Sequence, residues 1–288
     1  MYCKDMNNKT RLAMHGNGAC YGNIITNSKE AFEKWYRKGI RVFEVDIAKT
    51  ADDDFVAISH YVNKQALITR QIFAFPKEQS SYTKTWFKSL KLYKFTSPGL
   101  TPLSLEDIFL LMEKYPDVYI ILDTFGLFVL HDMEELREKI DTYVLSDEIR
   151  KRIFVEVYND EMFTGLGGYT TDLTIIYCLR YLHDGIEVYI QKTVEELRNM
   201  GIALISYPYK YIQSYQDVKY YLNGGIDIVS YSADNNHFEE MQDIGISINI
   251  VDNIYSRPFV GIKRYIFHVQ NFIYRAFAGV VRRAIKIM

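Results

Sequence analysis

The feature that most constrains this chain is a regular alternation of short β-branched runs with longer amphipathic stretches. The runs predict eight strands, at Arg11–His15, Ile40–Ile47, Val118–Thr124, Arg152–Val157, Leu173–Leu179, Ile202–Tyr207, Ile226–Tyr231 and Ser247–Val251. Helical patterns lie between most of them, at Ser28–Lys38, Ser104–Lys114, Met133–Val144, Val194–Met200, Ile212–Leu222 and Asn235–Asp243. Because parallel strands need crossover helices, this order predicts an α/β fold, a (β/α)8 TIM barrel.

The predicted helix ends agree with a repeated unit. Asn27 or Ser28 can cap the first helix, and Ser104 can cap a later one. Glycines stand between a predicted helix and the next predicted strand at Gly39, Gly201, Gly225 and Gly245. A glycine just past a helix end supplies the left-handed conformation that closes many helices. The four similar junctions therefore support one helix–strand unit used several times.

Length and composition limit the wider interpretation. The chain has 288 residues, and barrels of this class commonly reach about 250 residues as one domain. We predict a barrel over residues 1–258, with a loop insertion at about 61–100. The formal net charge of −2 gives no reason to expect a nucleic-acid partner. The three cysteines are scattered and favour neither a disulfide framework nor a zinc cluster. The sequence also shows no apolar leader and no apolar run long enough to cross a membrane, so we expect a cytoplasmic protein.

The last segment, residues 259–288, differs from the repeat. It carries six lysine and arginine residues and no acidic residue. Its apolar residues recur at steps of three or four, at Ile262, Ile266, Val269, Ile273, Phe277 and Val280. The pattern predicts a basic amphipathic C-terminal helix. Packing on the barrel, oligomerisation and peripheral contact with the anionic inner face of a membrane remain three open interpretations.

Chemistry-bearing side chains gather at the predicted strand ends. His15 ends the first strand, Glu44 and Asp46 share one face of the second, and Asp123 ends the third. His60 follows the acidic turn and the apolar run after the second strand. Paired carboxylates repel unless a cation offsets them, and hard oxygen ligands favour Mg²⁺, Ca²⁺ or Mn²⁺ over zinc. Together with two imidazoles, this set suits phosphoryl transfer with general acid–base catalysis.

Other polar residues fall at or just after strand ends. Glu156, Tyr158, Lys210 and Tyr231 are predicted substrate contacts, with packing of the upper core layer as the alternative. Lys210 would act as a point charge for phosphate. The acids at 52–54 are interpreted as a solvated turn, because aspartate favours turns.

Several of these runs resemble the glycerophosphodiester phosphodiesterase family. They are AMHG at 13–16, NSKEAF at 27–32, GIRVFEVD at 39–46 and the acidic turn before VAISH at 56–60. PLSLED at 102–107 is similar to that family's Pro-Thr-Leu-Glu helix start, and residues 245–252 are similar to its closing Gly-to-Asp strand. The resemblance spans most of the chain, with its specific motifs in the first sixty residues.

The resemblance implies roles for the residues at the strand ends. Glu44, Asp46 and Asp123 would be metal ligands, and His15 and His60 would be the base and acid pair. The related spider-toxin phospholipases D share the barrel layout, including an aspartate where Asp123 stands. The chain is thus predicted to be a phosphodiesterase that uses one divalent cation, with attack either by water or by a hydroxyl of the substrate.

Four departures from the family pattern concern the phosphate. Gly16 stands where the family has Arg, Thr26 where it has Glu, and Tyr61 where it has Asp. The segment 123–125, Asp-Thr-Phe, replaces Glu-x-Lys. The substrate is therefore predicted only as a small glycerophosphodiester or a phospholipid-headgroup-like diester. The alternative is a catalytically inactive barrel that binds phospho-headgroups or a protein partner.

Overall fold

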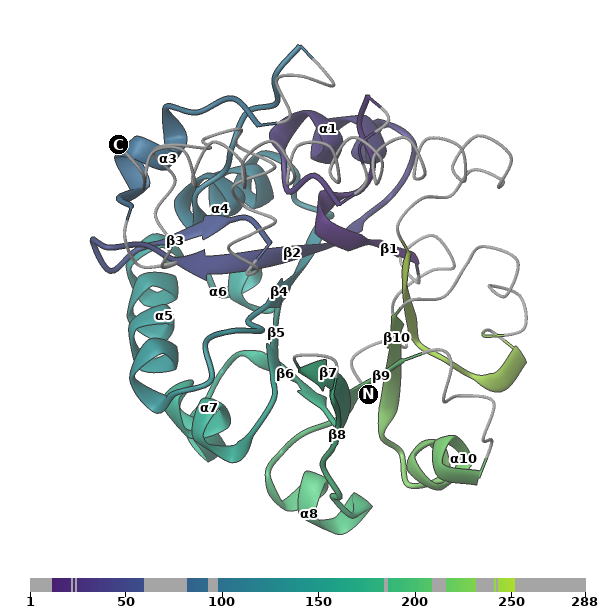
Figure 1. Ribbon diagram of the computed structural model, residues 1–288. Coiled ribbons are helices and arrows are strands. Elements are labelled where there is room, and N and C mark those ends of the chain that lie inside the picture. The colour runs from purple at the N-terminus through teal and green to yellow at the C-terminus, as the bar shows by residue number, and fades with distance from the viewer. Residues whose placement is uncertain are drawn as a thin grey trace, which may run out of the picture.

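A closed ring of parallel strands forms the centre of the molecule (Figure 1). The computed structural model describes residues 12–21, 23, 25–59, 82–92, 98–183, 186–208, 216–231, 241 and 243–251. The ring consists of β1 (Leu12–Met14), β2 (Val42–Lys49), β4 (Tyr119–Asp123), β5 (Ile153–Val157), β6 (Thr174–Cys178), β9 (Leu204–Pro208), β10 (Asp227–Tyr231) and β11 (Ile248–Val251). Because β1 pairs with both β2 and β11, the barrel closes. All eight predicted strands are present, which confirms the TIM barrel.

Helices surround this ring on the outside (Figure 1). Five lie where the sequence predicted them: α1 (Lys29–Arg37), α4 (Leu105–Lys114), α5 (Leu130–Tyr143), α8 (Val194–Asn199) and α10 (Gln216–Asn223). The sixth prediction, Asn235–Asp243, falls mostly outside the described residues. Short helices α6 (Asp147–Arg150) and α7 (Asp160–Gly165) and the 3-10 turns η2 (His15–Asn17) and η4 (Gly168–Thr170) were not predicted.

The helix ends use the predicted capping residues. The side chain of Ser28 accepts a hydrogen bond from the backbone N–H of Ala31 at the start of α1. Ser104 and Asp107 form a reciprocal capping box at the start of α4. The four glycines between helices and strands all have positive φ, between 72° and 97°. This confirms that the repeat is built from helices that end in a left-handed turn and lead directly into a strand.

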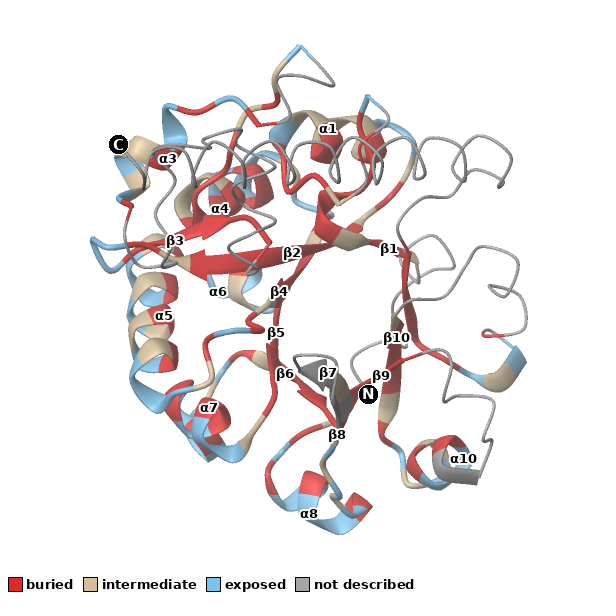
Figure 2. Cartoon of the chain, viewed as in Figure 1, coloured by how far each residue is buried: buried red, intermediate tan, exposed pale blue. Residues whose placement is uncertain are grey.

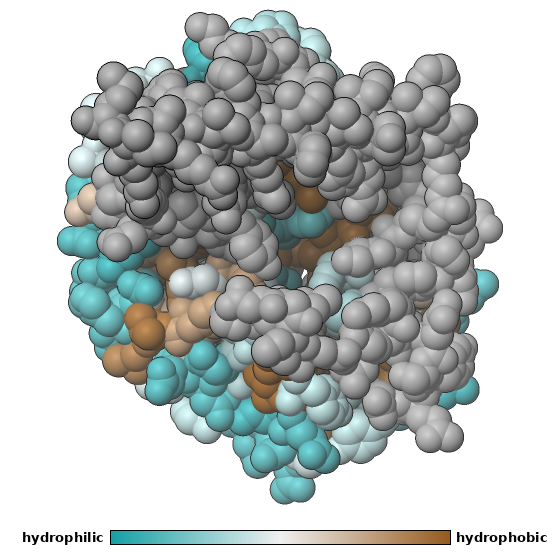
Figure 3. Space-filling model, in the orientation of Figure 1, coloured by the Kyte–Doolittle hydropathy of each residue, from teal (hydrophilic) through white to brown (hydrophobic). Residues whose placement is uncertain are grey.

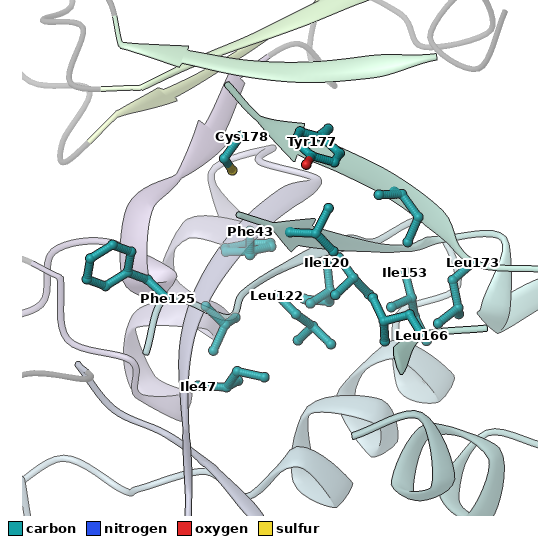
Figure 4. Packing of buried hydrophobic residues seen from close by; sticks show 14 of the residues in the cluster. Phe43, Ile47, Ile120, Leu122, Phe125, Ile153, Leu166, Leu173, Tyr177 and Cys178 are labelled. Carbon is teal, nitrogen blue, oxygen red and sulfur yellow. The ribbon is translucent and has the colours of Figure 1, made fainter. Parts of the chain in front are cut away.

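Apolar side chains fill two layers. The larger core lies between the strands and the helices, and Figure 4 shows part of it, with Phe43, Ile120, Leu122 and Ile153 labelled. The smaller core fills the inside of the barrel with Ala13, Val42, Ile121, Phe154, Ile176, Leu204, Val229, Ile248 and Ile250. The strands are accordingly buried along most of their length (Figure 2). In the part of the surface that Figure 3 leaves visible, the residues around α8 are mostly hydrophilic.

The described part of the insertion packs beside β2. Just before the insertion, β3 (Phe55–Ala57) pairs antiparallel with β2, and the short helix α3 (Lys84–Lys88) of the insertion packs against β3. A separate apolar cluster joins the two, with Val56, Ile58, Tyr82, Phe87, Leu92 and Leu100 among its members. These residues fix the insertion against the outside of the barrel.

The acidic turn at 52–54 is only partly the solvated turn that was expected. Asp52 and Asp53 are exposed, but Asp54 is buried, with 4% of its surface accessible. Its carboxylate forms an ion pair with Lys84 at 2.5 Å and accepts a hydrogen bond from the hydroxyl of Tyr143 at 2.6 Å. Asp54 therefore joins the insertion to α5, because a buried carboxylate needs a paired cation.

A second hairpin stands outside the repeat. It consists of β7 (Arg180–His183) and β8 (Ile186–Tyr189), and it follows directly after β6. Residues 259–288 lie outside the described residues, so the basic C-terminal helix, the boundary at 258 and membrane contact stay predictions. Within the described ranges, every helix is too short or too polar to cross a lipid bilayer.

Candidate functional site

The inside of the barrel changes character along each strand. At the amino end it is apolar, with Val42, Ile121, Phe154, Ile176 and Leu204. Two residues further along the same strands stand Glu44, Asp123, Glu156, Cys178 and Ser206. Because side chains alternate along a strand, these residues also face inward, at the carboxyl end. This end is where enzymes with this fold carry their active sites.

Three of the predicted residues form a group that would fit a metal ion. His15, Glu44 and Asp46 each offer one ligand atom, and these atoms lie within 4.8 Å of one another. The closest approach of His15 to Glu44, between Nε2 and Oε2, is 3.9 Å. Glu44 and Asp46 are 2% and 3% exposed. The side chain of His15 is 34% exposed and is therefore the member that solvent or a ligand reaches.

The turn η2 brings His15 over Glu44. Immediately after His15, the backbone N–H of Gly16 donates a hydrogen bond to Oε2 of Glu44 at 2.5 Å. Gly16 has a φ of 51°, and a Cβ atom there would lie 2.4 Å from Cγ2 of Ile25. A longer side chain at position 16 does not fit unless Ile25 moves. A residue as large as arginine at position 16 is thus incompatible with the shape of this turn.

Asp46 is held by a residue that the sequence suggested only as a helix cap. The side-chain amide of Asn27 donates to Oδ2 of Asp46 at 2.6 Å, and Oδ1 of Asn27 accepts from the backbone N–H of Asp46 at 3.1 Å. Asn27 is 2% exposed and has a φ of 46°. The signal that would have found it is its place in the NSKEAF run that matches the family. Asn27 fixes the carboxylate orientation from outside the strand.

Glu44 is electrostatically unfavourable in the absence of a cation. Burial raises the pKa of Glu44 well above its usual range, His15 opposes this shift, and Asp46 and Asp123 add to it. Its Oε1 atom is buried and has no hydrogen-bond partner among the described residues. A buried, unpaired carboxylate oxygen beside a second carboxylate is the environment that a divalent cation would stabilise. The residues present therefore fit a metal ion.

Asp123 lies next to this group but has its own partners. It is in register with Asp46 on the neighbouring strand. Its Oδ1 atom accepts hydrogen bonds from the hydroxyl of Tyr158 at 2.7 Å and from the backbone N–H of Phe125 at 2.8 Å. The same hydroxyl lies 3.0 Å from Oε2 of Glu156. Asp123, Tyr158 and Glu156 thus form one connected network beside the candidate metal centre.

The network is buried, which changes its proton affinities. Glu156 and Tyr158 are 5% and 6% exposed. Burial, followed by the charge of Asp123, raises the pKa of Glu156 to about 8. The same two causes raise the pKa of Tyr158. Burial and the neighbouring charge of Asp123 thus favour the protonated form of Glu156 more than in an exposed glutamate.

Of the remaining predicted site residues, the structure describes some and not others. Tyr231 ends β10 and packs, partly buried, against the apolar core inside the barrel. His60 and Lys210 lie outside the described residues. Cys178 and Ser206, which the sequence did not single out, share the carboxyl end with the acids, and burial raises the pKa of the Cys178 thiol well above its usual range. Of the two histidines and three acids predicted at the site, the structure describes one histidine, His15, and all three acids, Glu44, Asp46 and Asp123.

Comparison with known proteins supports the fold. No family model and no curated protein matches the sequence. Solved structures do match across most of the chain. A glycerophosphodiester phosphodiesterase from Parabacteroides distasonis has a TM-score of 0.64 and 21% identity, covering 91% of this chain and 98% of that chain. The fold is that of the glycerophosphodiester phosphodiesterases.

Two further structures show the same likeness. An Oleispira antarctica phosphodiesterase in complex with the product sn-glycerol-3-phosphate has a TM-score of 0.64 and 13% identity, covering 84% of this chain and 92% of that chain. A glycerophosphodiester phosphodiesterase from Agrobacterium tumefaciens has a TM-score of 0.61 and 14% identity, covering 85% and 97%. At these identities the likeness establishes the shared fold, and activity has to be argued from the site.

Proposed function

We propose that this protein is a metal-dependent phosphodiesterase that hydrolyses a small glycerophosphodiester or a phospholipid-headgroup-like substrate. The observation that carries the proposal is the group His15, Glu44 and Asp46, whose ligand atoms lie within 4.8 Å at the carboxyl end of the barrel. The fold supports it, because the Oleispira antarctica phosphodiesterase with this fold is in complex with sn-glycerol-3-phosphate.

The proposed roles follow from exposure and charge. Glu44 and Asp46, with Asp123 beside them, would hold one divalent cation, Mg²⁺, Ca²⁺ or Mn²⁺. Bound there, the cation would offset charge on the phosphate. His15 would accept the proton of the attacking hydroxyl, since its side chain is 34% exposed. His60 would donate a proton to the leaving oxygen.

Four residues, Lys210, Tyr231, Glu156 and Tyr158, were predicted to contact the substrate, and for Lys210 and Tyr231 we propose direct contact. Lys210 would supply the positive charge that Gly16 and Phe125 do not. For Glu156 and Tyr158, almost complete burial favours an indirect role over direct contact with substrate. These assignments stay predictions.

The test compares His15 with a matched histidine. His131 lies on α5, and its side chain is 73% exposed. Among the described residues, its ion-pair partners are Glu134 and Glu135. Hydrolysis of bis-(p-nitrophenyl) phosphate and glycerophosphocholine would be measured with each cation and with EDTA. His15→Ala should lower the rate by about 100-fold or more, whereas His131→Ala should match the unaltered protein. Equal rates in all three proteins would overturn the proposal.

One observation favours the second candidate, a barrel that binds without catalysis. Where the family has a lysine, Phe125 packs edge-on against Phe128 and Tyr158, at 5.0 and 5.2 Å between ring centroids. A side chain held in this way supplies no charge to a phosphate. Binding of glycerol-3-phosphate in the presence of Mn²⁺, without turnover of either diester, would favour this candidate over the enzyme.

A further inference from the structure

Tyr158 contacts two carboxyl groups with one hydroxyl. The hydroxyl lies 2.7 Å from Oδ1 of Asp123 and 3.0 Å from Oε2 of Glu156. A phenol has one proton and therefore donates to one acceptor. The contact with Asp123 is the shorter of the two, which favours Asp123 as the acceptor of the phenol proton. The hydroxyl of Tyr158 thus links the carboxyl groups of Asp123 and Glu156.

The carboxylate of Asp123 is fixed by the hydroxyl of Tyr158 and by the loop that follows β4. Its Oδ1 atom also accepts the backbone N–H of Phe125 at 2.8 Å. Two donors on one oxygen define the rotation of the carboxyl group, and they come from two different segments of the chain. Asp123 stands in register with Asp46, so its orientation bears directly on the group that would hold a metal.

The ring of Tyr158 is held in turn by three aromatic neighbours. Its centroid lies 5.2 Å from Phe125, 6.0 Å from Phe128 and 5.0 Å from Tyr181, each in an edge-to-face arrangement. We call these four residues the aromatic cluster. Phe125 and Phe128 belong to the connection from β4 to α5, whereas Tyr181 comes from the β7–β8 hairpin. The hairpin therefore has a contact with the site, although it is not part of the barrel repeat.

We propose that Tyr158 is a positioning residue, which orients Asp123 toward the candidate metal centre and is itself fixed by the aromatic cluster. This inference rests on the proposed function, because it needs a metal held by Glu44 and Asp46 beside Asp123. Groups that orient a metal ligand typically change metal affinity by about 10- to 100-fold when they are lost. A role in packing alone would change stability and leave the affinity of the folded protein unaltered.

The test measures binding of Mn²⁺ to the full chain. Titration calorimetry and the electron paramagnetic resonance signal of free Mn²⁺ would both report the Kd. Tyr158→Phe keeps the ring and removes the hydroxyl. Its matched control is Tyr177→Phe, because the hydroxyl of Tyr177 donates to a different carboxylate, Asp160, at 2.7 Å. The Kd for Mn²⁺ should rise by about 10-fold in Tyr158→Phe and stay unchanged in Tyr177→Phe.

A second variant keeps the hydrogen bonds and loosens the ring. Tyr181→Leu leaves Tyr158, Asp123 and Glu156 in place, and it should raise the Kd for Mn²⁺ by less than Tyr158→Phe does. It also carries the test if Tyr158→Phe fails to fold. An unchanged Kd in the folded Tyr158 variant, or in Tyr181→Leu when that variant stands in for it, would overturn this inference and leave the proposed function intact. Absence of Mn²⁺ binding by the unaltered protein would overturn both.

Discussion

The two ends of the barrel interior are built from the same strands and differ in what they hold. At the amino end, inward side chains such as Val42 and Phe154 pack in an apolar core. At the carboxyl end, Glu44, Asp123 and Glu156 occupy the next inward positions. The first arrangement stabilises the fold in any condition. The second is unfavourable until something offsets its charge, which is typical of sites selected for function over stability.

The largest effect should come from the apolar end. Phe154 is 2% exposed and stacks on Tyr119 with 6.0 Å between ring centroids. Phe154→Ala should lower the free energy of unfolding by about 3–5 kcal/mol, measured by urea denaturation. The Kd of the folded variant for Mn²⁺ should not change. A parallel loss of metal affinity would show that the two ends are not independent.

At the carboxyl end, we expect a substitution to change metal binding without lowering the stability of the metal-free protein. In the unaltered protein, Mn²⁺ at a hundredfold excess over its Kd should add about 2.7 kcal/mol to the free energy of unfolding. Glu44→Gln should abolish this increment and leave the metal-free protein no less stable, because the substitution removes a buried negative charge that lies beside Asp46 and Asp123. Glu106→Gln, on the exposed face of α4, is the control. An increment that survived in the Glu44 variant would place the metal elsewhere.

A pH profile sharpens the comparison further. The pKa of Glu156 is raised from 4.5 to about 8, so between these values the folded protein keeps a proton that the unfolded chain has lost. Unfolding free energy of the metal-free protein should therefore fall as pH rises through this window, by at most about 1.4 kcal/mol per pH unit. Glu156→Gln should flatten the profile. Identical slopes in the two proteins would contradict the assigned shift.

The smallest effect is expected at a junction of the amino end. Gly39 has a φ of 94°, and a Cβ atom there would meet nothing within 4 Å. Gly39→Ala should therefore lower the free energy of unfolding by about 1 kcal/mol, from backbone strain alone. Thermal denaturation would measure it, with the Mn²⁺-induced stabilisation as the internal control. A loss as large as that of Phe154→Ala would mean that the junction does more than end a helix.

The repeat was predictable because period and turn chemistry are local properties. Strands and helices of the barrel were found from them, and so was the closure. The β7–β8 hairpin was missed because Leu179 alone separates β6 from β7, so the two runs look like one. Asp54 was misjudged for a related reason, since its ion pair with Lys84 joins residues thirty positions apart.

The residues of the candidate site likewise divide into those that local pattern predicts and those that it does not. Glu44, Asp46 and Asp123 were found because strand alternation dictates where their side chains point. Asn27 was not, since its contact with Asp46 depends on a loop conformation with positive φ that no periodicity reveals. The network of Tyr158 with Asp123 and Glu156 was also hidden. Sequence placed all three at strand ends, and only the structure shows which of them touch.

The close approach of Gly16 to Ile25 makes substitutions at these two positions depend on each other. Ile25 itself has a φ of 54°, which is unusual for a β-branched residue. Gly16→Arg alone would create a clash, because Ile25 occupies the space that the new side chain enters. A smaller residue at position 25 would have to come first. The effect of a larger side chain at position 16 therefore depends on which residue occupies position 25.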